Sequence, residues 1–293
     1  PRILDYVEWQ KAVRTAEARG ESSPQLPKDI SLLSVNLDLT TACNYRCDHC
    51  IDFDILNSPV KYKHDMLLKS LGNMIRDGLR SVILIGGGEP TLYPQFGEVV
   101  RFLKKQGVQV AIVSNGSRNQ KIHEIADVLT RGDWVRLSLD SGNDATFQQM
   151  HKPVKLVQLE DICSWIPRFR ERNPTLEIGF SFIIVGKGAE RDESVTIVEN
   201  IDEIVSATKL ARAHGFSYIS LKPFLTRHPD GAEVMDVDVM TNFNETLEKI
   251  RRAVDEAKAL ATDTFEVRES LNLKVLMEGT WRKYTHQPKT CHM

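Results

Sequence analysis

The sequence contains no long apolar run and no excess of charge of either sign. No segment approaches the ~18–20 consecutive apolar residues that a membrane-spanning helix needs. No secretory leader is visible, although the chain begins at Pro1 rather than Met. The net charge is −2 without a long block of like charges, so there is no strong nucleic-acid signal. We therefore expect a globular cytoplasmic protein that does not associate with membranes.

Cysteine is also scarce, with only five in 293 residues. Three of them, Cys43, Cys47 and Cys50, lie close together in the spacing Cys-x3-Cys-x2-Cys. This spacing is too tight for the disulfide framework of a chain this long, and in a reducing compartment it favours a metal site. Cys163 has apolar neighbours and is expected to be a buried structural thiol. The tail contains one cysteine, Cys291, and one cysteine cannot hold a second cluster. An alternative is that the full-length protein continues into an extension with further cysteines.

Strand-like and helix-like segments alternate through the middle of the chain. Six strands are expected, over residues 33–40, 81–85, 108–113, 134–139, 176–185 and 216–221. Helices are expected between them, including 156–172 with a kink or break at Pro167 and 194–214. This pattern predicts an α/β fold with parallel strands, either an open doubly wound sheet or a barrel. We divide the chain into an N-terminal helix and linker (1–32), this main domain (33–225) and a helical C-terminal extension (226–293).

Glycine and polar residues recur where the predicted strands end. Gly86-Gly87-Gly88-Glu89-Pro90 follows the second strand, and the turn lets the backbone approach a ligand closely while Glu89 accepts a cationic amine. The alternative is a tight turn with an exposed glutamate. Ser114-Asn115-Gly116 and Ser138-Leu139-Asp140 end the next two strands, where they either contact a ligand or cap the strand.

The cysteine triplet by itself leaves two metals open. Thiolates hold iron–sulfur clusters, and a cubane with three local cysteines has one iron without a protein ligand. Zinc is the alternative, with His49 or the tail pair Cys291 and His292 as the fourth ligand.

Together, these segments resemble the radical S-adenosylmethionine (SAM) enzymes, which favours the cluster over zinc. The resemblance covers about residues 33–224 in the family's order and spacing. It implies a partial (β/α)6 TIM-like barrel and a [4Fe–4S] cluster on Cys43, Cys47 and Cys50, whose open iron chelates SAM. One electron then cleaves SAM to a 5′-deoxyadenosyl radical, which removes a hydrogen atom from the substrate. The electron comes from a donor such as flavodoxin or ferredoxin.

The resemblance also assigns SAM contacts. Gly87, Gly88 and Glu89 match the motif for the methionine amine. His49 stands where relatives usually carry an aromatic residue beside the adenine, which is a departure. The strand-end residues that reach SAM or the substrate in relatives correspond to Ser114, Asn115, Ser138 and Asp140.

The substrate site is expected inside the barrel. Alternation along the strands directs polar side chains inward, namely Asn36, Asp38, Arg136, Tyr218, Ser220 and Lys222. Lys222 either binds a carboxylate or phosphate, or pairs with Asp38 or Glu177. His151 and Lys152 are expected in a solvated loop.

We predict tailoring of a small polar metabolite such as a sugar or nucleoside, because no complete set of auxiliary-cluster cysteines is present. The alternatives are modification of a ribosomal peptide or protein and, in another class, a non-catalytic iron–sulfur or zinc protein.

Overall fold

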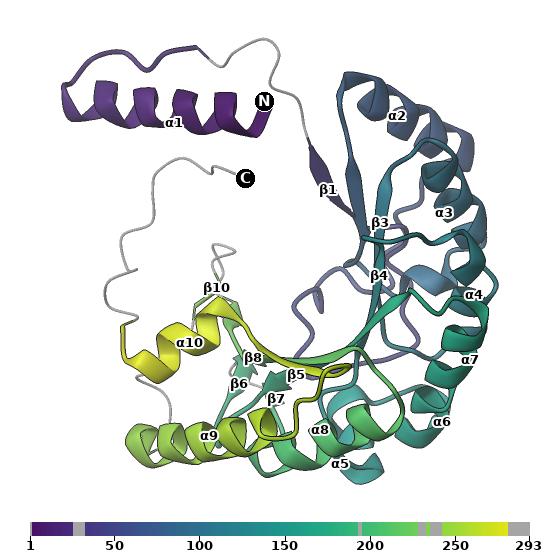
Figure 1. Cartoon of the computed structure of the whole chain (residues 1–293), viewed down its shortest axis with the longest axis vertical. Coiled ribbons are helices and arrows are strands. Elements are labelled where there is room, and N and C mark those ends of the chain that lie inside the picture. The colour runs from purple at the N-terminus through teal and green to yellow at the C-terminus, as the bar shows by residue number, and fades with distance from the viewer. Residues whose placement is uncertain (1, 26–32, 193–194, 228–232, 235–241, 281–293) are drawn as a thin grey trace.

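The computed structural model of the chain describes residues 2–25, 33–192, 195–227, 233–234 and 242–280. At its centre, a seven-stranded parallel sheet curves into an open, C-shaped wall (Figure 1). The predicted partial barrel is thus confirmed. In spatial order the strands are β1 (Ser34–Leu37), β2 (Ser81–Leu84), β3 (Gln109–Ser114), β4 (Trp134–Ser138), β5 (Glu177–Ile184), β8 (Tyr218–Pro223) and β11 (Glu266–Glu269).

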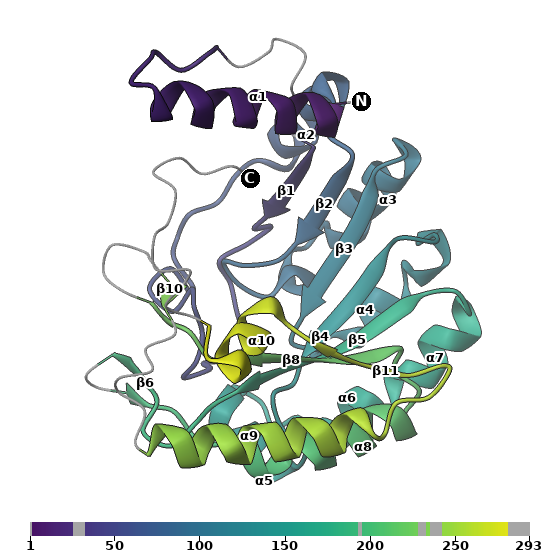
Figure 2. The same ribbon diagram turned by 60° about the vertical axis from the view of Figure 1, so that its left-hand side comes forward.

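Helices cover the convex face of the sheet and leave the concave face open (Figures 1 and 2). The covering helices are α2 (His64–Asp77), α3 (Phe96–Lys105), α4 (Asn119–His123), α5 (Asp144–His151), α6 (Leu159–Cys163), α7 (Trp165–Arg172) and α8 (Ile204–Ala213). Short 3-10 turns are η1 (Pro90–Leu92), η2 (Ala126–Val128) and η3 (Ile201–Glu203).

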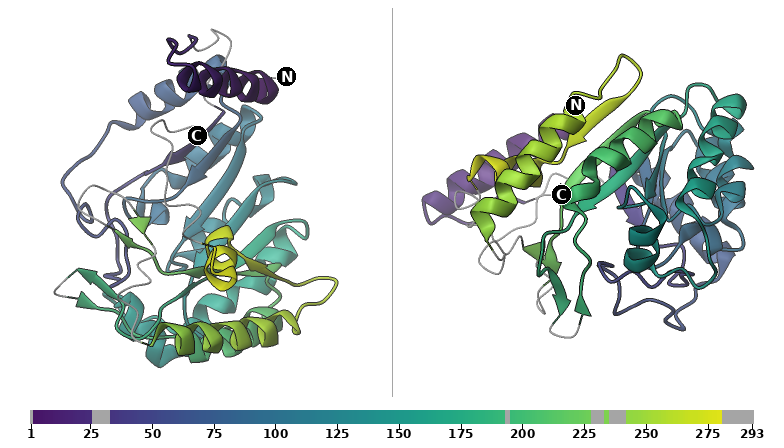
Figure 3. Two further views of the ribbon diagram at one scale, coloured as in Figure 1. Left: turned by 90° about the vertical axis from the view of Figure 1, so that its left-hand side faces the viewer. Right: turned by 90° about the horizontal axis from the view of Figure 1, so that it is seen from below.

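Further elements flank this wall. α9 (Phe243–Lys258) packs on α8, and α10 (Leu271–Glu278) packs on β8. α1 (Arg2–Ala18) lies apart, beyond the β1 edge of the sheet (Figure 3). Two small hairpins pair β6 (Glu190–Asp192) with β7 (Val195–Thr196), and β9 (Thr226–Arg227) with β10 (Glu233–Val234).

The core lies between the sheet and its outer helices. On β4, Val135 and Leu137 are fully buried, whereas the residues that follow each of them, Arg136 and Ser138, are only partly buried. Successive side chains of a strand point to opposite faces, so the apolar set faces the helices and the polar set faces the concave side. The concave face of β4 can therefore supply polar side chains to a functional site, while the face toward the helices stays apolar.

Strand register places small and polar residues side by side on the concave face. Ser138 on β4 pairs with Ser181 on β5, which pairs with Ser220 on β8. Two residues before Ser138, on the same face of β4, Arg136 pairs with Gly179 of β5. A Cβ on Gly179 would lie 2.2 Å from the ring of Tyr218. Because Gly179 has no side chain, the ring of Tyr218 on β8 can lie over the backbone of β5 at this position.

The predicted kink or break near Pro167 is found as a break, and two other details differ from the sequence prediction. The predicted helix over 156–172 is two helices that meet at Ser164, three residues before Pro167. Proline lacks an N–H to bond the carbonyl four residues earlier, and its ring clashes with it, so α6 ends at Cys163. The predicted helix over 194–214 begins only at Ile204, after the β6–β7 hairpin and η3.

The second difference is the seventh strand. β11 pairs in parallel with β8, from Glu266 beside Tyr218 to Glu269 beside Leu221. This strand is short and mostly charged, so it carries no apolar signal in the sequence, and the six-strand prediction missed it. No helix in the described parts of the chain combines the length and hydropathy needed to cross a bilayer.

Candidate active site

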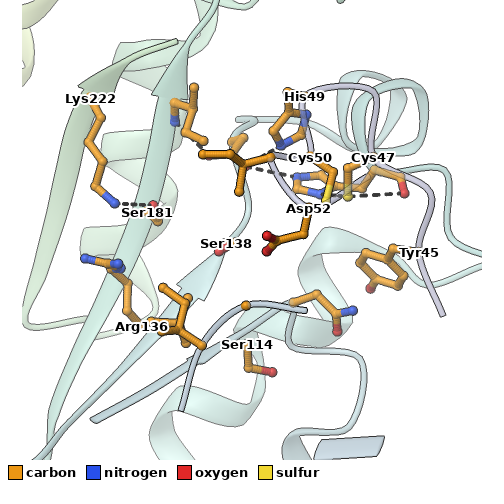
Figure 4. A pocket seen from close by; sticks show the side chains of 18 of the residues that line it. Tyr45, Cys47, His49, Cys50, Asp52, Ser114, Arg136, Ser138, Ser181 and Lys222 are labelled. Carbon is orange, nitrogen blue, oxygen red and sulfur yellow. Dashed lines mark hydrogen bonds and ion pairs between the residues drawn. The ribbon is translucent and has the colours of Figure 1, made fainter. Parts of the chain in front are cut away.

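One cavity collects most of the residues predicted to be functional. It has a volume of about 390 Å³ and lies at the carboxyl edge of the sheet, beside residues 43–50, which we call the cysteine loop (Figure 4). Active sites of parallel α/β barrels lie at this edge. The predicted residues that line it are Cys43, Cys47, His49, Cys50, Gly88, Glu89, Ser114, Asn115, Arg136, Ser138, Asp140 and Lys222.

Five predicted residues are not among those that line this cavity: Asn36, Asp38, Gly87, Tyr218 and Ser220. Asn36 and Asp38 are exposed. Tyr218 is buried, and the guanidinium carbon of Arg268 lies 3.8 Å from the centre of its ring. Direct ligand contacts by these residues stay predictions. The tail cysteine Cys291 lies outside the described residues.

Backbone hydrogen bonds hold the cysteine loop against the end of α5. The amides of Arg46 and Asp48 donate to the carbonyls of His151 and Met150, each at 3.1 Å. The amide of Val154 donates in return to the carbonyl of Asn44 at 3.0 Å. These backbone contacts hold the cysteine loop on the end of α5.

The three cysteines are free, partly buried thiols. Burial is the main cause that raises the pKa of each thiol, to about 11 for Cys50. Repulsion from neighbouring sulfurs raises the pKa of Cys47 and Cys50 further. A metal centre bound by all three sulfurs would relieve this repulsion, because coordinated thiols are deprotonated by the metal charge. The residues therefore fit an iron–sulfur cluster.

The glycine-rich turn after β2 packs directly on the residues that precede Cys43. A Cβ on Gly88 would lie 2.2 Å from the carbonyl oxygen of Ala42, so a side chain here would displace the backbone. The next residue, Glu89, donates its amide to the same carbonyl at 2.9 Å. The turn thus fixes the start of the cysteine loop, which is a positional reason for glycine.

Both carboxylate oxygens of Glu89 are occupied within the protein. Oε1 accepts from the Thr91 amide (3.0 Å), the Thr91 hydroxyl (2.6 Å) and the Ser114 hydroxyl (2.8 Å). Oε2 accepts from the Asn115 amide at 2.7 Å. Burial raises the pKa of Glu89, and these hydrogen bonds oppose that rise. Glu89 therefore ties the end of β3 to the turn after β2.

Asp140 joins the ends of β4 and β5 in a strained conformation. Its φ is +50°, a region that non-glycine residues enter at a cost. Oδ1 accepts from the Ile183 amide at 2.7 Å, and Oδ2 lies 3.1 Å from His49 Nε2. Burial would raise the pKa of Asp140, but the hydrogen bond and charge of His49, together with the nearby His151, lower it. The buried carboxylate of Asp140 thereby orients the His49 ring.

His151 is the functional candidate that the sequence prediction missed. It is not in a solvated loop: it ends α5 and is 1% exposed. Its Nδ1 lies 3.2 Å from Cys47 Sγ, and its Nε2 lies 3.0 Å from the Leu139 carbonyl. Burial, then repulsion from His49, lowers the pKa of His151 to about 4.

A sequence signal for α5 did exist. Asn143 caps the helix by accepting a hydrogen bond from the Thr146 amide, and Phe147 and Met150 recur at helical spacing. Lys152, just past the helix end, pairs with Asp48 at 2.6 Å. The helix was overlooked because it has only eight residues.

Arg136 and Lys222 bring two positive charges to the cavity from opposite sides of β5 (Figure 4). Neither forms an ion pair with a described residue. Lys222 donates only to the Ser181 hydroxyl at 3.2 Å, and Arg136 Nε is buried without a hydrogen-bond partner. The alternative in which Lys222 pairs with Asp38 or Glu177 is not found, and Glu177 instead pairs with Arg268 at 2.7 Å.

Burial, followed by repulsion from Arg136, lowers the pKa of Lys222 to about 8. Burial likewise lowers the pKa of Arg136. The buried carboxylate of Asp140 raises both pKa values in part, but it forms no ion pair with either cation. Two cations that face one cavity without a described ion pair are arranged to receive an anion.

Comparison with known proteins agrees with this geometry. The model of the Radical SAM superfamily matches residues 37–201, more than half of the chain. A nucleotide dehydratase of Selenomonas ruminantium, described as S-adenosylmethionine-dependent, is 30% identical over 172 residues, which cover 56% of this chain and 60% of that protein. A cofactor-modifying protein for tungsten-containing aldehyde ferredoxin oxidoreductase, from Pyrococcus furiosus, is 32% identical over 107 residues, covering 36% of this chain and 30% of that protein. The chain thus matches 60% or less of the length of these relatives.

Solved structures show the same fold. SuiB of Streptococcus suis, crystallised with SAM, superposes with a TM-score of 0.59 at 12% identity, over 89% of this chain and 54% of that one. The family's cofactors are a [4Fe–4S] cluster and SAM, and the cavity is lined by the three thiols together with Gly88 and Glu89 of the glycine-rich turn. The chain therefore belongs to the radical SAM superfamily of enzymes.

Proposed function

We propose that the protein carries its [4Fe–4S] cluster on Cys43, Cys47 and Cys50 and removes a hydrogen atom from a small anionic metabolite of the nucleotide type. The observation that carries the substrate class is the pair Arg136 and Lys222, which face the cavity without carboxylate partners among the described residues. Once bound, the cluster supplies the electron that splits SAM into methionine and a 5′-deoxyadenosyl radical.

The chain's own residues position and shield this chemistry. Glu89 holds Ser114 and Asn115 at the end of β3, and Asp140 holds His49 of the cysteine loop. We assign these strand ends, with the backbone of Gly87 and Gly88, to SAM. Apolar side chains such as Val113, Ile183 and Phe224 complete the lining and limit water access.

An anionic substrate follows from the charges in the cavity. In a partly buried site a phosphate accepts charge-assisted hydrogen bonds from guanidinium and ammonium groups, and these are stronger than neutral ones. Arg136 and Lys222 line the same cavity as the cysteine loop, so a phosphate bound to them holds the rest of the molecule in that cavity. The name of the Selenomonas ruminantium relative, a nucleotide dehydratase, agrees with such a substrate.

Modification of a peptide is the second candidate. It draws on the likeness to SuiB, which was also crystallised with a precursor peptide, but at 12% identity that likeness speaks to the fold alone. The two cations that face the cavity, Arg136 and Lys222, favour an anionic group over a neutral peptide backbone. A small molecule is therefore the better proposal.

The decisive experiment compares substrates in the reconstituted enzyme. The protein is loaded with iron and sulfide without oxygen, reduced with dithionite and incubated with SAM and either nucleoside triphosphates or the matching nucleosides. We expect 5′-deoxyadenosine and methionine, with turnover stimulated by the phosphorylated compounds and not by the nucleosides. Failure to cleave SAM with an intact cluster would refute the enzymatic proposal, and equal stimulation by nucleosides would refute the anionic substrate.

A further inference from the structure

Exposed residues of the cysteine loop and of two neighbouring segments form a surface patch that the proposed reaction does not use. Three short segments meet there: residues 44–48, 117–118 and 152–156. The Asn44 side chain donates to the Ser117 hydroxyl at 2.9 Å, and the Val154 amide donates to the Asn44 carbonyl at 3.0 Å. These contacts make one continuous surface out of segments far apart in the sequence.

The patch is positively charged. It presents four exposed cations, Arg46, Arg118, Lys152 and Lys155. Of these, Lys152 pairs with Asp48 at 2.6 Å, while Arg46, Arg118 and Lys155 form no ion pair with any described residue. The net charge of the patch is thus positive, although the whole chain carries −2.

The patch also exposes apolar side chains. Val154 is 64% exposed and Leu156 is 77% exposed, which places them among the most exposed large apolar residues in the described part of the chain. Apolar side chains ringed by unpaired charges of one sign are typical of transient protein–protein contacts, in which charge guides the encounter and apolar area adds contact.

The position of the patch relative to Cys47 indicates what binds. Cys47 Sγ lies 3.6 Å from the carbonyl oxygen of His151, and Lys152 follows directly on the surface. The backbone of one residue thus separates a proposed cluster ligand from the patch. Cys43, Tyr45 and Cys47 of the cysteine loop line the cavity, whereas the four cations of the patch do not.

We propose that this patch docks a small acidic one-electron carrier protein of the flavodoxin type. The carrier's negative charge complements Arg46, Arg118 and Lys155, and Val154 and Leu156 supply the apolar contact. One electron leaves the reduced carrier, which is oxidised, and reduces the cluster by one unit. The inference rests on the proposed cluster on Cys43, Cys47 and Cys50, and it adds the surface through which the cluster is reduced.

The test separates protein-mediated reduction from chemical reduction. In the double variant Arg118→Glu and Lys155→Glu, we expect the second-order rate of cluster reduction by flavodoxin hydroquinone to fall at least about tenfold at low ionic strength. The effect should shrink as salt is added, because exposed charges are screened. Cluster absorbance in stopped flow gives this rate. Reduction by dithionite, iron content and SAM cleavage with dithionite should stay at wild-type values.

The matched control reverses an arginine and a lysine at the opposite edge of the sheet. Lys105 ends α3 and Arg131 precedes β4, and both are exposed. In the variant Lys105→Glu and Arg131→Glu, reduction by flavodoxin should be unchanged. Equal slowing in both double variants, no slowing in the first, or no reduction of the wild-type protein by flavodoxin would overturn the proposal. Loss of dithionite-driven SAM cleavage in the wild-type protein would instead count against the proposed function.

Discussion

The two halves of the sheet's carboxyl edge treat their polar groups in opposite ways. At the ends of β2 and β3, Glu89 is satisfied by four hydrogen bonds from within the protein. Between β4 and β8, Arg136 and Lys222 have no acidic partner among the described residues. The first half is a finished frame for the cysteine loop, whereas the second half keeps unpaired charge for a ligand.

This difference explains how one cavity can serve two molecules. A satisfied buried network is rigid, and rigidity suits the cofactor, whose position must not vary. A buried charge without a partner costs folding free energy, which the protein retains only where a ligand later compensates it. Substitutions in the two halves should therefore separate effects on cofactor and stability from effects on the substrate.

The largest expected effect comes from Cys47→Ala. We expect this variant to lose the cluster while keeping a folded barrel, because backbone hydrogen bonds to α5 position the loop. Iron and sulfide analysis, together with far-UV circular dichroism, measures both. The control is Cys163→Ala, which removes a buried thiol on α6 away from the cavity and should retain the cluster. A full iron and sulfide complement in Cys47→Ala would contradict the ligand assignment.

Glu89→Gln tests the rigid half. In the variant, one carboxylate oxygen of Glu89 becomes an NH2 group, which cannot accept a hydrogen bond from the donors around it. We therefore expect the free energy of unfolding to fall by about 1–3 kcal/mol. Urea denaturation of the cluster-free protein measures it. Glu98→Gln is the control, since Glu98 is largely exposed beside His64 and should change stability by less than about 0.5 kcal/mol. Equal stability of the two variants would show that the network does not stabilise the fold.

Lys222→Met tests the open half. We expect an anionic ligand to bind about 10–100-fold more weakly, because a charged hydrogen bond is lost, while the cluster content stays unchanged. Stability should stay equal or rise, since methionine replaces a largely buried cation whose only described hydrogen-bond partner is Ser181. Calorimetric titration with a nucleoside triphosphate gives the affinity. Lys209→Met, exposed on α8, should bind as the wild type does.

The smallest effect is a pH dependence of ligand binding. The pKa of Lys222 is lowered to about 8, so Lys222 is charged below that pH and loses its charge above it. Affinity for an anion should be full near pH 7 and fall as pH rises above about 8, by no more than about tenfold per pH unit. Lys222→Arg stays charged and should give a flatter profile. Identical profiles would exclude Lys222 as the titrating group.

The sequence was sufficient for six of the seven strands and for the cysteine and glycine-rich motifs. Alternation marks β4 because that strand has one buried face, and periodicity of this kind is local. The cysteine spacing and the Gly87-Gly88-Glu89 turn are also local, so the resemblance to the family could be recognised without coordinates. β11 was not recognised, because its place in the sheet depends on β8 and not on its own residues.

Tertiary structure decided the role of individual polar groups. Nothing in the sequence places His151 against Cys47, since the two are 104 residues apart and meet only because α5 packs on the cysteine loop. The same holds for Lys222, which had Glu177 as a plausible partner until Arg268 on β11 was found to occupy that carboxylate. Chain order determines which residues share a strand face. Whether a charge is paired or left for a ligand is set by long-range packing, because an ion pair needs contact within a few ångströms, which no spacing along the chain specifies.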